Sequence, residues 1–233
     1  MSTSPVIISP QTVALFVGKR GTGKSWKRKQ LLTAAVASGM RVLSLDMLDE
    51  DSIHGRKRKA VELGPLTQRM TTDELAESLD VLRQERLALA VVPVNDDPRE
   101  WALDVEAILV EVQEEGDLLL SLTELAVWSQ YAAAALNKAA LLSRHWGDEG
   151  VPIAADSQRA TGIPFSFRTQ ATDILSGLQD MPEDLDALGD RCGPRFADEV
   201  GACRGHEFRH WRDSDGRWER PQPRGKTSQR NRK

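Results

Sequence analysis

The residues best suited to chemistry form one short segment near the N-terminus, GKRGTGKS. They are Gly18, Lys19, Arg20, Gly21, Thr22, Gly23, Lys24 and Ser25. The spacing of glycines before a Lys-Ser pair lets backbone N–H groups surround phosphates, while the lysine side chain reaches the outer phosphates. The serine hydroxyl in the last position is a ligand for magnesium. The segment therefore predicts a site for a nucleoside triphosphate, which we take to be ATP, together with Mg2+.

A carboxylate is also needed before a bound triphosphate can be hydrolysed, and it usually follows an apolar strand. The candidate segment is LLLSLTE, residues 118–124. Glu124 stands where a carboxylate would polarise water, and with Ser25 it is our candidate ligand for magnesium. Thr123 stands where aspartate is usual, so magnesium would depend on Ser25, phosphates, water and the Thr123 hydroxyl, and slower hydrolysis is one consequence. Alternatively, Glu124 only begins a helix, as acidic residues often do.

Apolar strands alternate with helices along the chain, which predicts an α/β fold with a central, mostly parallel sheet flanked by helices. The phosphate segment opens a helix expected from about residue 23 to 39. The other expected helices cover residues 72–85, 97–115, 126–146, 183–190 and 194–203, and the strands cover residues 12–17, 41–46, 87–94, 117–123, 151–155 and 171–178. The very apolar strand at 117–123 should be central, and 49–70 is expected to be a loop. Residues 206–212 and 217–220 flank an Asp-Gly turn signal and predict a closing β-hairpin near the C-terminus.

The length of 233 residues and the formal net charge of −4 fit a single soluble α/β domain. We divide the chain into an N-terminal extension (1–11), the nucleotide-binding domain (12–220) and a basic tail (221–233), which we expect to be disordered. No apolar run approaches the roughly 20 residues of a membrane helix, and the N-terminus does not resemble a secretory signal. The expected location is therefore the cytoplasm.

Four motifs follow one another in an informative order. They are GKRGTGKS at 18–25, LLLSLTE at 118–124, SRHWG at 143–147, and an apolar strand with SQR at 151–159. A loop containing Pro164, a Gln-Ala step, the strand DILSGL and the acidic segment PEDLDAL come next. This order resembles the HerA/FtsK superfamily of P-loop ATPases, especially the genome-packaging ATPases of tailless, membrane-containing viruses with double-stranded DNA.

The resemblance implies a P-loop NTPase fold of the RecA-like (ASCE) type and a hexameric ring that hydrolyses ATP to move double-stranded DNA. It implies that Gln158 is the polar sensor of the γ-phosphate or the attacking water, and that Arg144 is an arginine finger offered to a neighbouring subunit. With Lys24 and Glu124, these are the candidate catalytic residues. Capsid or membrane-vertex proteins of a virus are further implied partners, and the location would be host cytoplasm or virion. On physical grounds alone, each residue has a simpler alternative role. Arg144 would satisfy the carbonyls and the dipole at the C-terminal end of a helix, and Gln158 would be a solvated side chain at the end of a strand.

The chain departs from the family pattern in three places. Thr123 replaces the common aspartate, residues 147–150 lengthen a turn, and Ala160 stands where proline is usual. These departures weaken the catalytic assignment more than the fold. They keep open the interpretation that the chain is a nucleotide-binding assembly or regulatory protein with feeble turnover.

A small-molecule kinase is the main alternative function, because Gly18, Gly21 and Gly23 also fit G-x-x-G-x-G-K-S, a variant common in such enzymes. Asp46, at the end of an expected strand, would then position the phosphate acceptor. The basic segment near Arg56 would bind a phosphate of the substrate.

Non-specific binding of DNA would use basic residues. The expected contacts are Arg56, Lys57, Arg58 and Lys59, assisted by the basic tail, although such a cluster can equally be a solvated face. The six tryptophans are scattered singly, so we expect them to pack in the core or at interfaces rather than to stack on bases. They are Trp26, Trp101, Trp128, Trp146, Trp211 and Trp218.

Overall fold

The computed structural model describes residues 6–53, 64–94 and 98–215. The basic cluster at 56–59, the second arm of the predicted hairpin at 217–220 and the basic tail lie outside these ranges. Within them, part of the N-terminal extension packs on the domain, because Val6 and Ile8 lie against the core beside the first helix.

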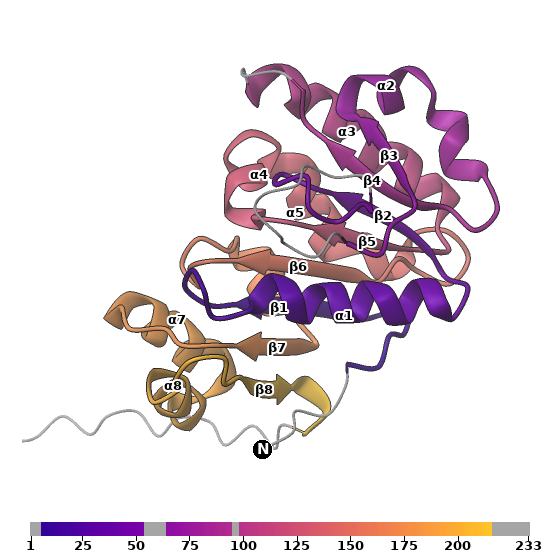
Figure 1. Ribbon diagram of the computed structural model, residues 1–233. Helices are drawn as coiled ribbons and strands as arrows, with labels where there is room; N and C mark the ends of the chain where they lie inside the picture. Colours follow the sequence, from indigo (N-terminus) through magenta and orange to yellow (C-terminus); the bar gives the residue numbers. More distant parts are fainter. Residues whose placement is uncertain (1–5, 54–63, 95–97, 216–233) are drawn as a thin grey trace, which may run out of the picture.

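The described chain forms an eight-stranded sheet in the order β3-β4-β2-β5-β6-β1-β7-β8 (Figure 1). All neighbouring strands are parallel except β7 and β8, which are antiparallel. The strands are β1 (Val13–Val17), β2 (Arg41–Leu45), β3 (Gln68–Thr71), β4 (Ala88–Val92), β5 (Leu118–Leu122), β6 (Ile153–Ser157), β7 (Asp173–Ser176) and β8 (Arg209–Arg212). The mostly parallel sheet and the central place of β5 are as the sequence predicts.

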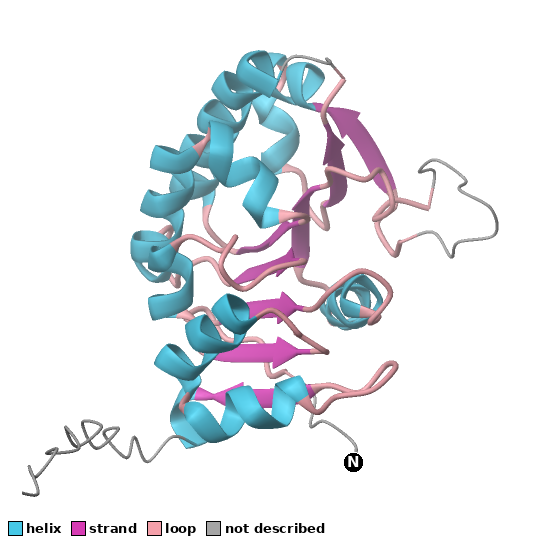
Figure 2. Ribbon diagram, turned by 90° about the vertical axis from the view of Figure 1, so that its left-hand side faces the viewer, coloured by secondary structure: helices cyan, strands magenta, loops and turns pink. Residues whose placement is uncertain are grey.

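Helices cover both faces of the sheet, and the two faces are unequal (Figure 2). Of the described helices, α1 packs on one face, whereas α3, α4 and α5 lie on the other. The helices are α1 (Lys24–Ala37), α2 (Thr72–Glu77), α3 (Pro98–Glu115), α4 (Leu125–Tyr131), α5 (Ala133–Leu142), α6 (Phe165–Gln170), α7 (Pro182–Cys192) and α8 (Pro194–Gly201). Side chains of β5 alternate between the two cores, with Leu118, Leu120 and Leu122 on the α3 side and Leu119 on the α1 side.

Four elements differ from the sequence prediction, and one of them is α6, which forms where the sequence predicts a loop before the Gln-Ala step. β3 lies within the segment expected to be a loop, because its four residues are polar or partly exposed and give no apolar signal. α2 begins as predicted, with a capping box between Thr71 and Glu74, but it ends at Glu77 and a 3-10 turn follows at Leu79–Arg83. The helix predicted over 126–146 is divided at Ala132 into α4 and α5.

The C-terminal part of the domain closes the sheet with an antiparallel pair. β8 pairs with β7, so that Ser176 lies opposite Arg209 and Asp173 opposite Arg212. His210 bonds to the Asp173 carboxylate at 2.7 Å, which ties the two strands together by their side chains. Among the described helices, none has the length and apolar character needed to cross a bilayer.

The parallel sheet gathers the sequence motifs at one edge. β5, β6 and β1 are adjacent, and the residues after their carboxyl ends are Thr123 and Glu124, Gln158, and the phosphate loop. Ligands of open α/β sheets bind beyond these strand ends. The fold therefore places three of the predicted site segments side by side.

Candidate nucleotide-binding site

The phosphate loop is fixed at its start by two neighbouring strands. The Gly18 N–H donates to the Ser157 carbonyl (3.2 Å), and the Lys19 N–H donates to the Leu178 carbonyl (3.3 Å). A Cβ on Gly18 would lie 2.5 Å from the Thr22 hydroxyl oxygen, so only glycine fits there. Gly21 has a φ of 86°, which is left-handed backbone that a side chain would strain.

α1 begins at Lys24 with an uncapped N-terminus. Gly23 is its N-cap, with a φ of 93° and no side-chain hydrogen bond to the first turn, and that turn holds no acidic residue. The first amides of a helix have no partners within the helix, and its dipole adds positive potential there. The loop is thus built for an anion such as a phosphate group, as the sequence predicts.

Three of the four predicted catalytic side chains meet at this edge. The Lys24 ammonium lies 3.6 Å from Glu124 Oε1, and the Gln158 amide donates to the same oxygen at 3.0 Å. The side chains of Lys24 and Glu124 are only 9% and 10% exposed. Glu124 therefore points toward the phosphate loop and does not simply begin a helix at the surface.

Thr123 points away from this cluster, contrary to the expectation that its hydroxyl assists the magnesium ion. Its Oγ1 accepts the N–H of Met47 at 2.6 Å and donates to the carbonyl of Leu45 at 3.3 Å. The hydroxyl is thus occupied by the end of the neighbouring strand β2. The expected help of Thr123 in holding magnesium therefore does not fit this geometry.

A buried ion cluster beneath the site was not predicted. Arg28, one turn after Lys24 on α1, is 1% exposed. Its guanidinium donates to Asp156 Oδ2 at 2.9 Å, to both oxygens of Asp51 at 2.7 Å, and to the Ser121 hydroxyl. The second oxygen of Asp156 accepts the backbone N–H of Glu124 at 2.9 Å. Arg28 therefore connects the phosphate helix to the backbone of the residue assigned to water activation.

For Arg28 and Asp51, burial and the neighbouring charges shift the pKa in opposite directions. Burial opposes the charged form of Arg28, but Asp51 and Asp156 outweigh it and raise the guanidinium pKa above its usual value. Burial also opposes ionisation of Asp51, yet Arg28 holds the pKa of that carboxyl below its usual range. Burial, and then the charge of Asp51, raise the pKa of nearby Asp46 to about 7.

Asp46 shapes the backbone after β2. Its carboxylate accepts N–H groups of Leu48 (3.2 Å), Glu50 (2.6 Å) and Asp51 (2.7 Å), and the residue is fully buried. A carboxylate engaged in this way cannot position the acceptor of a phosphoryl group. The kinase role considered for Asp46 is therefore wrong in this structure.

Arg144 is not brought to the phosphate loop of its own chain. It is an exposed residue in the 3-10 turn Ser143–His145, and its side chain donates to His145 Nε2 at 3.1 Å. A Cβ on Gly150 would lie within 3.0 Å of the carbonyls of both Arg144 and Pro10, and Pro10 precedes β1. Arg144 therefore lies near the amino end of β1, roughly 16 Å of strand away from the loop that follows its carboxyl end.

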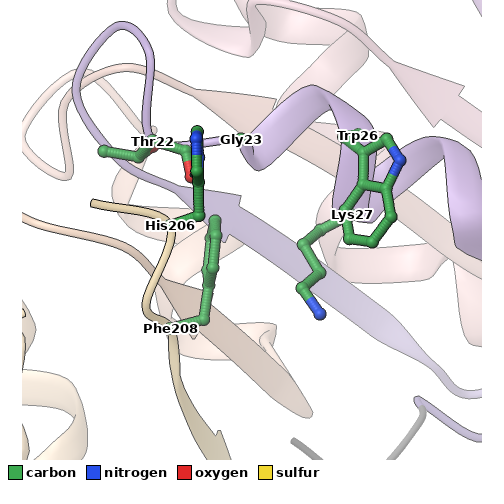
Figure 3. A pocket seen from close by; sticks show the side chains of 6 residues that line it. All are labelled: Thr22, Gly23, Trp26, Lys27, His206 and Phe208. Carbon is green, nitrogen blue, oxygen red and sulfur yellow. The ribbon is translucent and has the colours of Figure 1, made fainter. Parts of the chain in front are cut away.

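An apolar pocket of about 350 Å³ lies beside the phosphate loop (Figure 3). Its lining residues are Thr22, Gly23, Trp26, Lys27, His206 and Phe208. His206 Nδ1 bonds to the Thr22 carbonyl at 3.0 Å, which joins the segment before β8 to the phosphate loop. Trp101, Trp128 and Trp146 are buried in the core, as one of the two predicted settings of the tryptophans requires, whereas Trp26 is 53% exposed and lies outside it.

Comparisons with solved structures find the same fold in viral packaging enzymes. The chain is similar to the genome-packaging NTPase B204 of Sulfolobus turreted icosahedral virus 2 in complex with AMPPCP, with a TM-score of 0.66 and 16% identity over 88% of this chain and 94% of that one. It is also similar to the DNA-packaging ATPase B204 of Sulfolobus turreted icosahedral virus, with a TM-score of 0.62 and 14% identity over 89% and 95% of the two chains.

The likeness predicted from the order of the motifs is confirmed for the fold, and it extends over most of the chain. No family model matches the sequence, and no curated protein sequence matches it.

Replacing Arg28 with methionine tests the buried ion cluster. Arg28→Met would leave Asp51 and Asp156 buried without their cation, so we expect the free energy of unfolding to fall by about 3–5 kcal/mol. Urea denaturation without nucleotide measures this loss. Arg69→Met is the matched control, because Arg69 pairs with Asp49 at a partly exposed position and should lose about 1 kcal/mol or less. Equal losses in the two variants would contradict the cluster's importance.

The raised pKa of Asp46 predicts a pH-dependent stability. Because its pKa of about 7 lies above the ordinary value near 4, protonated Asp46 adds stability that is fully present below about pH 4 and lost as the pH rises through 7. Arg28 and Asp51, which face it, stay charged in this window. In Asp46→Asn the side chain stays neutral, so the wild type should lose stability relative to the variant between pH 4 and 7. Parallel urea midpoints at all pH values would show that the pKa is not raised.

Proposed function

We propose that this protein is an ATP-hydrolysing motor that moves double-stranded DNA, of the type that packages viral genomes. The observation that carries the proposal is the meeting of Lys24, Glu124 and Gln158 at one oxygen beside an uncapped helix N-terminus. The fold, which it shares with two viral packaging enzymes, supports the same conclusion. The location would be the host cytoplasm or the virion.

The residues of the site have separable roles in hydrolysis. The ammonium of Lys24, which contacts Glu124 here, would turn to the β- and γ-phosphates when the loop is filled. Glu124 would then accept a hydrogen bond from the attacking water and take its proton, since its carboxylate lies 3.6 Å from the ammonium of Lys24. Gln158, already bonded to Glu124, would orient this carboxylate and contact the γ-phosphate or the water.

Magnesium fits the site only together with a nucleotide. The part of the chain that the structure describes contains no group of three or more His, Cys, Asp or Glu residues able to hold a metal ion. Ser25 and Glu124 would hold the ion with phosphate oxygens and water, as is usual for Mg2+. When bound, it would neutralise charge that develops on the phosphates.

A ring is the assembly that would bring Arg144 to a phosphate group. Arg144 is exposed and lies at the edge of the sheet opposite its own phosphate loop, so it can act only on the nucleotide of a neighbouring subunit. We therefore keep it as an arginine finger in trans and propose a hexameric ring. Double-stranded DNA would be bound by the basic residues 56–59 and the tail, through phosphate contacts without sequence preference. Capsid or membrane-vertex proteins would be the other partners.

A regulatory nucleotide-binding protein with feeble turnover is the second candidate. The observation that favours it is the orientation of Thr123, whose hydroxyl is bonded to the backbone of β2 instead of facing the loop. The steady-state turnover measured in the next experiment distinguishes this candidate from the motor.

Two substitutions separate binding from hydrolysis. Lys24→Ala should lose affinity for ATP, whereas Glu124→Gln should bind ATP normally and lower kcat by about 10²- to 10⁴-fold, because only the base is removed. Steady-state phosphate release and equilibrium binding of ATP measure the two effects. Glu149→Gln, in an exposed turn, is the control and should be unchanged. Wild-type turnover in both Lys24 and Glu124 variants would refute the assigned site.

Double-stranded DNA should stimulate the ATPase, and the stimulation should fall steeply as salt rises, because it depends on phosphate contacts. Arg144→Ala should abolish stimulated turnover while leaving ATP binding intact. Mixing Arg144→Ala with Lys24→Ala subunits should restore part of the activity, since some interfaces then combine an intact Lys24 with an intact Arg144.

Arg195→Ala is the control for this experiment, because the Arg195 side chain is 93% exposed and pairs with Glu199 on its own helix. Absence of both DNA stimulation and nucleotide-dependent oligomers would end the motor proposal. Stimulation without recovery on mixing would remove Arg144 from the mechanism.

A further inference from the structure

The apolar pocket beside the phosphate loop has no part in the mechanism above. It lies between the loop, the first turn of α1 and the segment that precedes β8 (Figure 3). Three aromatic rings, those of Trp26, His206 and Phe208, form much of its lining. Trp26 and Phe208 come from segments 182 residues apart in the chain, so the fold alone brings them together.

The pocket combines aromatic faces with a cation. The Lys27 ammonium lies 5.3 Å from the centre of the Trp26 ring and 5.9 Å from that of Phe208. Its walls expose almost no polar atoms. A flat aromatic group is the ligand that such walls favour, because it can stack on the rings and displace water from them.

The position of the pocket indicates which chemical group the other end of that ligand carries. Thr22 and Gly23 belong both to the pocket lining and to the phosphate loop, so a molecule in the pocket continues directly into the anion site. Its volume of about 350 Å³ lies within the range of roughly 300–1,000 Å³ of small-molecule sites. A ligand with a flat aromatic end and a polyphosphate end is a nucleotide.

We infer that this pocket binds the purine base of the nucleotide by stacking on Trp26 and Phe208, and that it hardly distinguishes adenine from guanine. The inference rests on the proposed binding of a nucleoside triphosphate by the phosphate loop. Adenine and guanine differ in the hydrogen-bonding groups on the ring edge, and apolar walls cannot read that difference. The Lys27 ammonium can donate only to an acceptor, and both purines carry the N7 acceptor. A site with so few hydrogen-bonding partners discriminates only weakly between similar ligands.

His206 fixes the position of one pocket wall relative to the phosphate loop. Its Nδ1 must carry the hydrogen, because the partner is the carbonyl of Thr22, which can only accept. A Cβ on Gly23 would approach this nitrogen to 3.2 Å, so glycine there also keeps the ring close to the loop. His206 thereby fixes the wall formed by the segment before β8.

Competition binding with five probes tests the inference: ATP, GTP, CTP, UTP and inorganic tripolyphosphate. In the wild type we expect ATP and GTP to bind within about tenfold of each other, pyrimidine nucleotides to bind more weakly, and tripolyphosphate most weakly. Trp26→Ala should weaken ATP and GTP by about 5- to 150-fold, as expected for the loss of one stack, and leave tripolyphosphate unchanged. In turnover assays the same variant should raise KM with little change in kcat.

The matched control is Phe165→Ala, which removes another exposed aromatic ring, 74% exposed at the start of α6. Phe208 is buried, so Phe208→Leu is used in place of alanine to preserve folding while removing the aromatic face. Loss of purine affinity in Trp26→Ala and Phe208→Leu, but not in Phe165→Ala, supports the pocket.

The outcomes also separate this inference from the proposed function. If neither ATP nor tripolyphosphate binds, nucleotide binding itself fails. If both bind, both depend on Lys24 and the base adds no affinity, then the phosphate site stands and the base pocket is refuted. A preference of more than 100-fold for ATP over GTP would show that the base edge is read, and would overturn the inference.

Discussion

The buried guanidinium of Arg28 is the interaction on which the arrangement of the site depends. It joins α1 to the end of β6 through Asp156 and to the segment after β2 through Asp51. Buried charges are tolerated only when their partners and hydrogen bonds are complete, so these segments cannot shift independently. Because Asp156 also accepts the Glu124 N–H, the cluster sets the backbone from which the catalytic carboxylate projects.

This constraint bears on the two residues that follow β5, Thr123 and Glu124. The hydroxyl of Thr123 is bonded to the end of β2, and Glu124 has a left-handed φ of 49° that turns its side chain toward Lys24. The carboxylate Asp156, which lies close by, is committed to Arg28 and is not available to a metal ion. The negative charge of Asp156 is therefore structural, while the Glu124 carboxylate lies 3.6 Å from the Lys24 ammonium.

The position of the candidate site could be predicted from sequence where it depends on local spacing and strand order. The glycines of GKRGTGKS specify the backbone conformation of the phosphate loop. Glu124 and Gln158 follow apolar strands, and a parallel sheet brings the carboxyl ends of its strands to one edge. The ion cluster could not be predicted, because charged residues are expected at the surface and the partners of Arg28 come from distant segments. One signal was available: Asp156 interrupts an apolar strand. No local signal marks Phe208 as a neighbour of the loop, and β3 is too polar to suggest a strand.

Because of its helical period, α1 presents two sets of side chains on two different faces. Lys24 and Arg28 are four residues apart, so they share the face that is turned toward the sheet and the catalytic carboxylate. Trp26 and Lys27 fall on the remaining surface, where the helix meets the segment before β8. The helix N-terminus, where we propose that the phosphates bind, lies between these faces. One helix thus joins the proposed base pocket to the cluster of Lys24, Glu124 and Gln158, and Arg28 anchors that helix to the segments after β2 and at the end of β6.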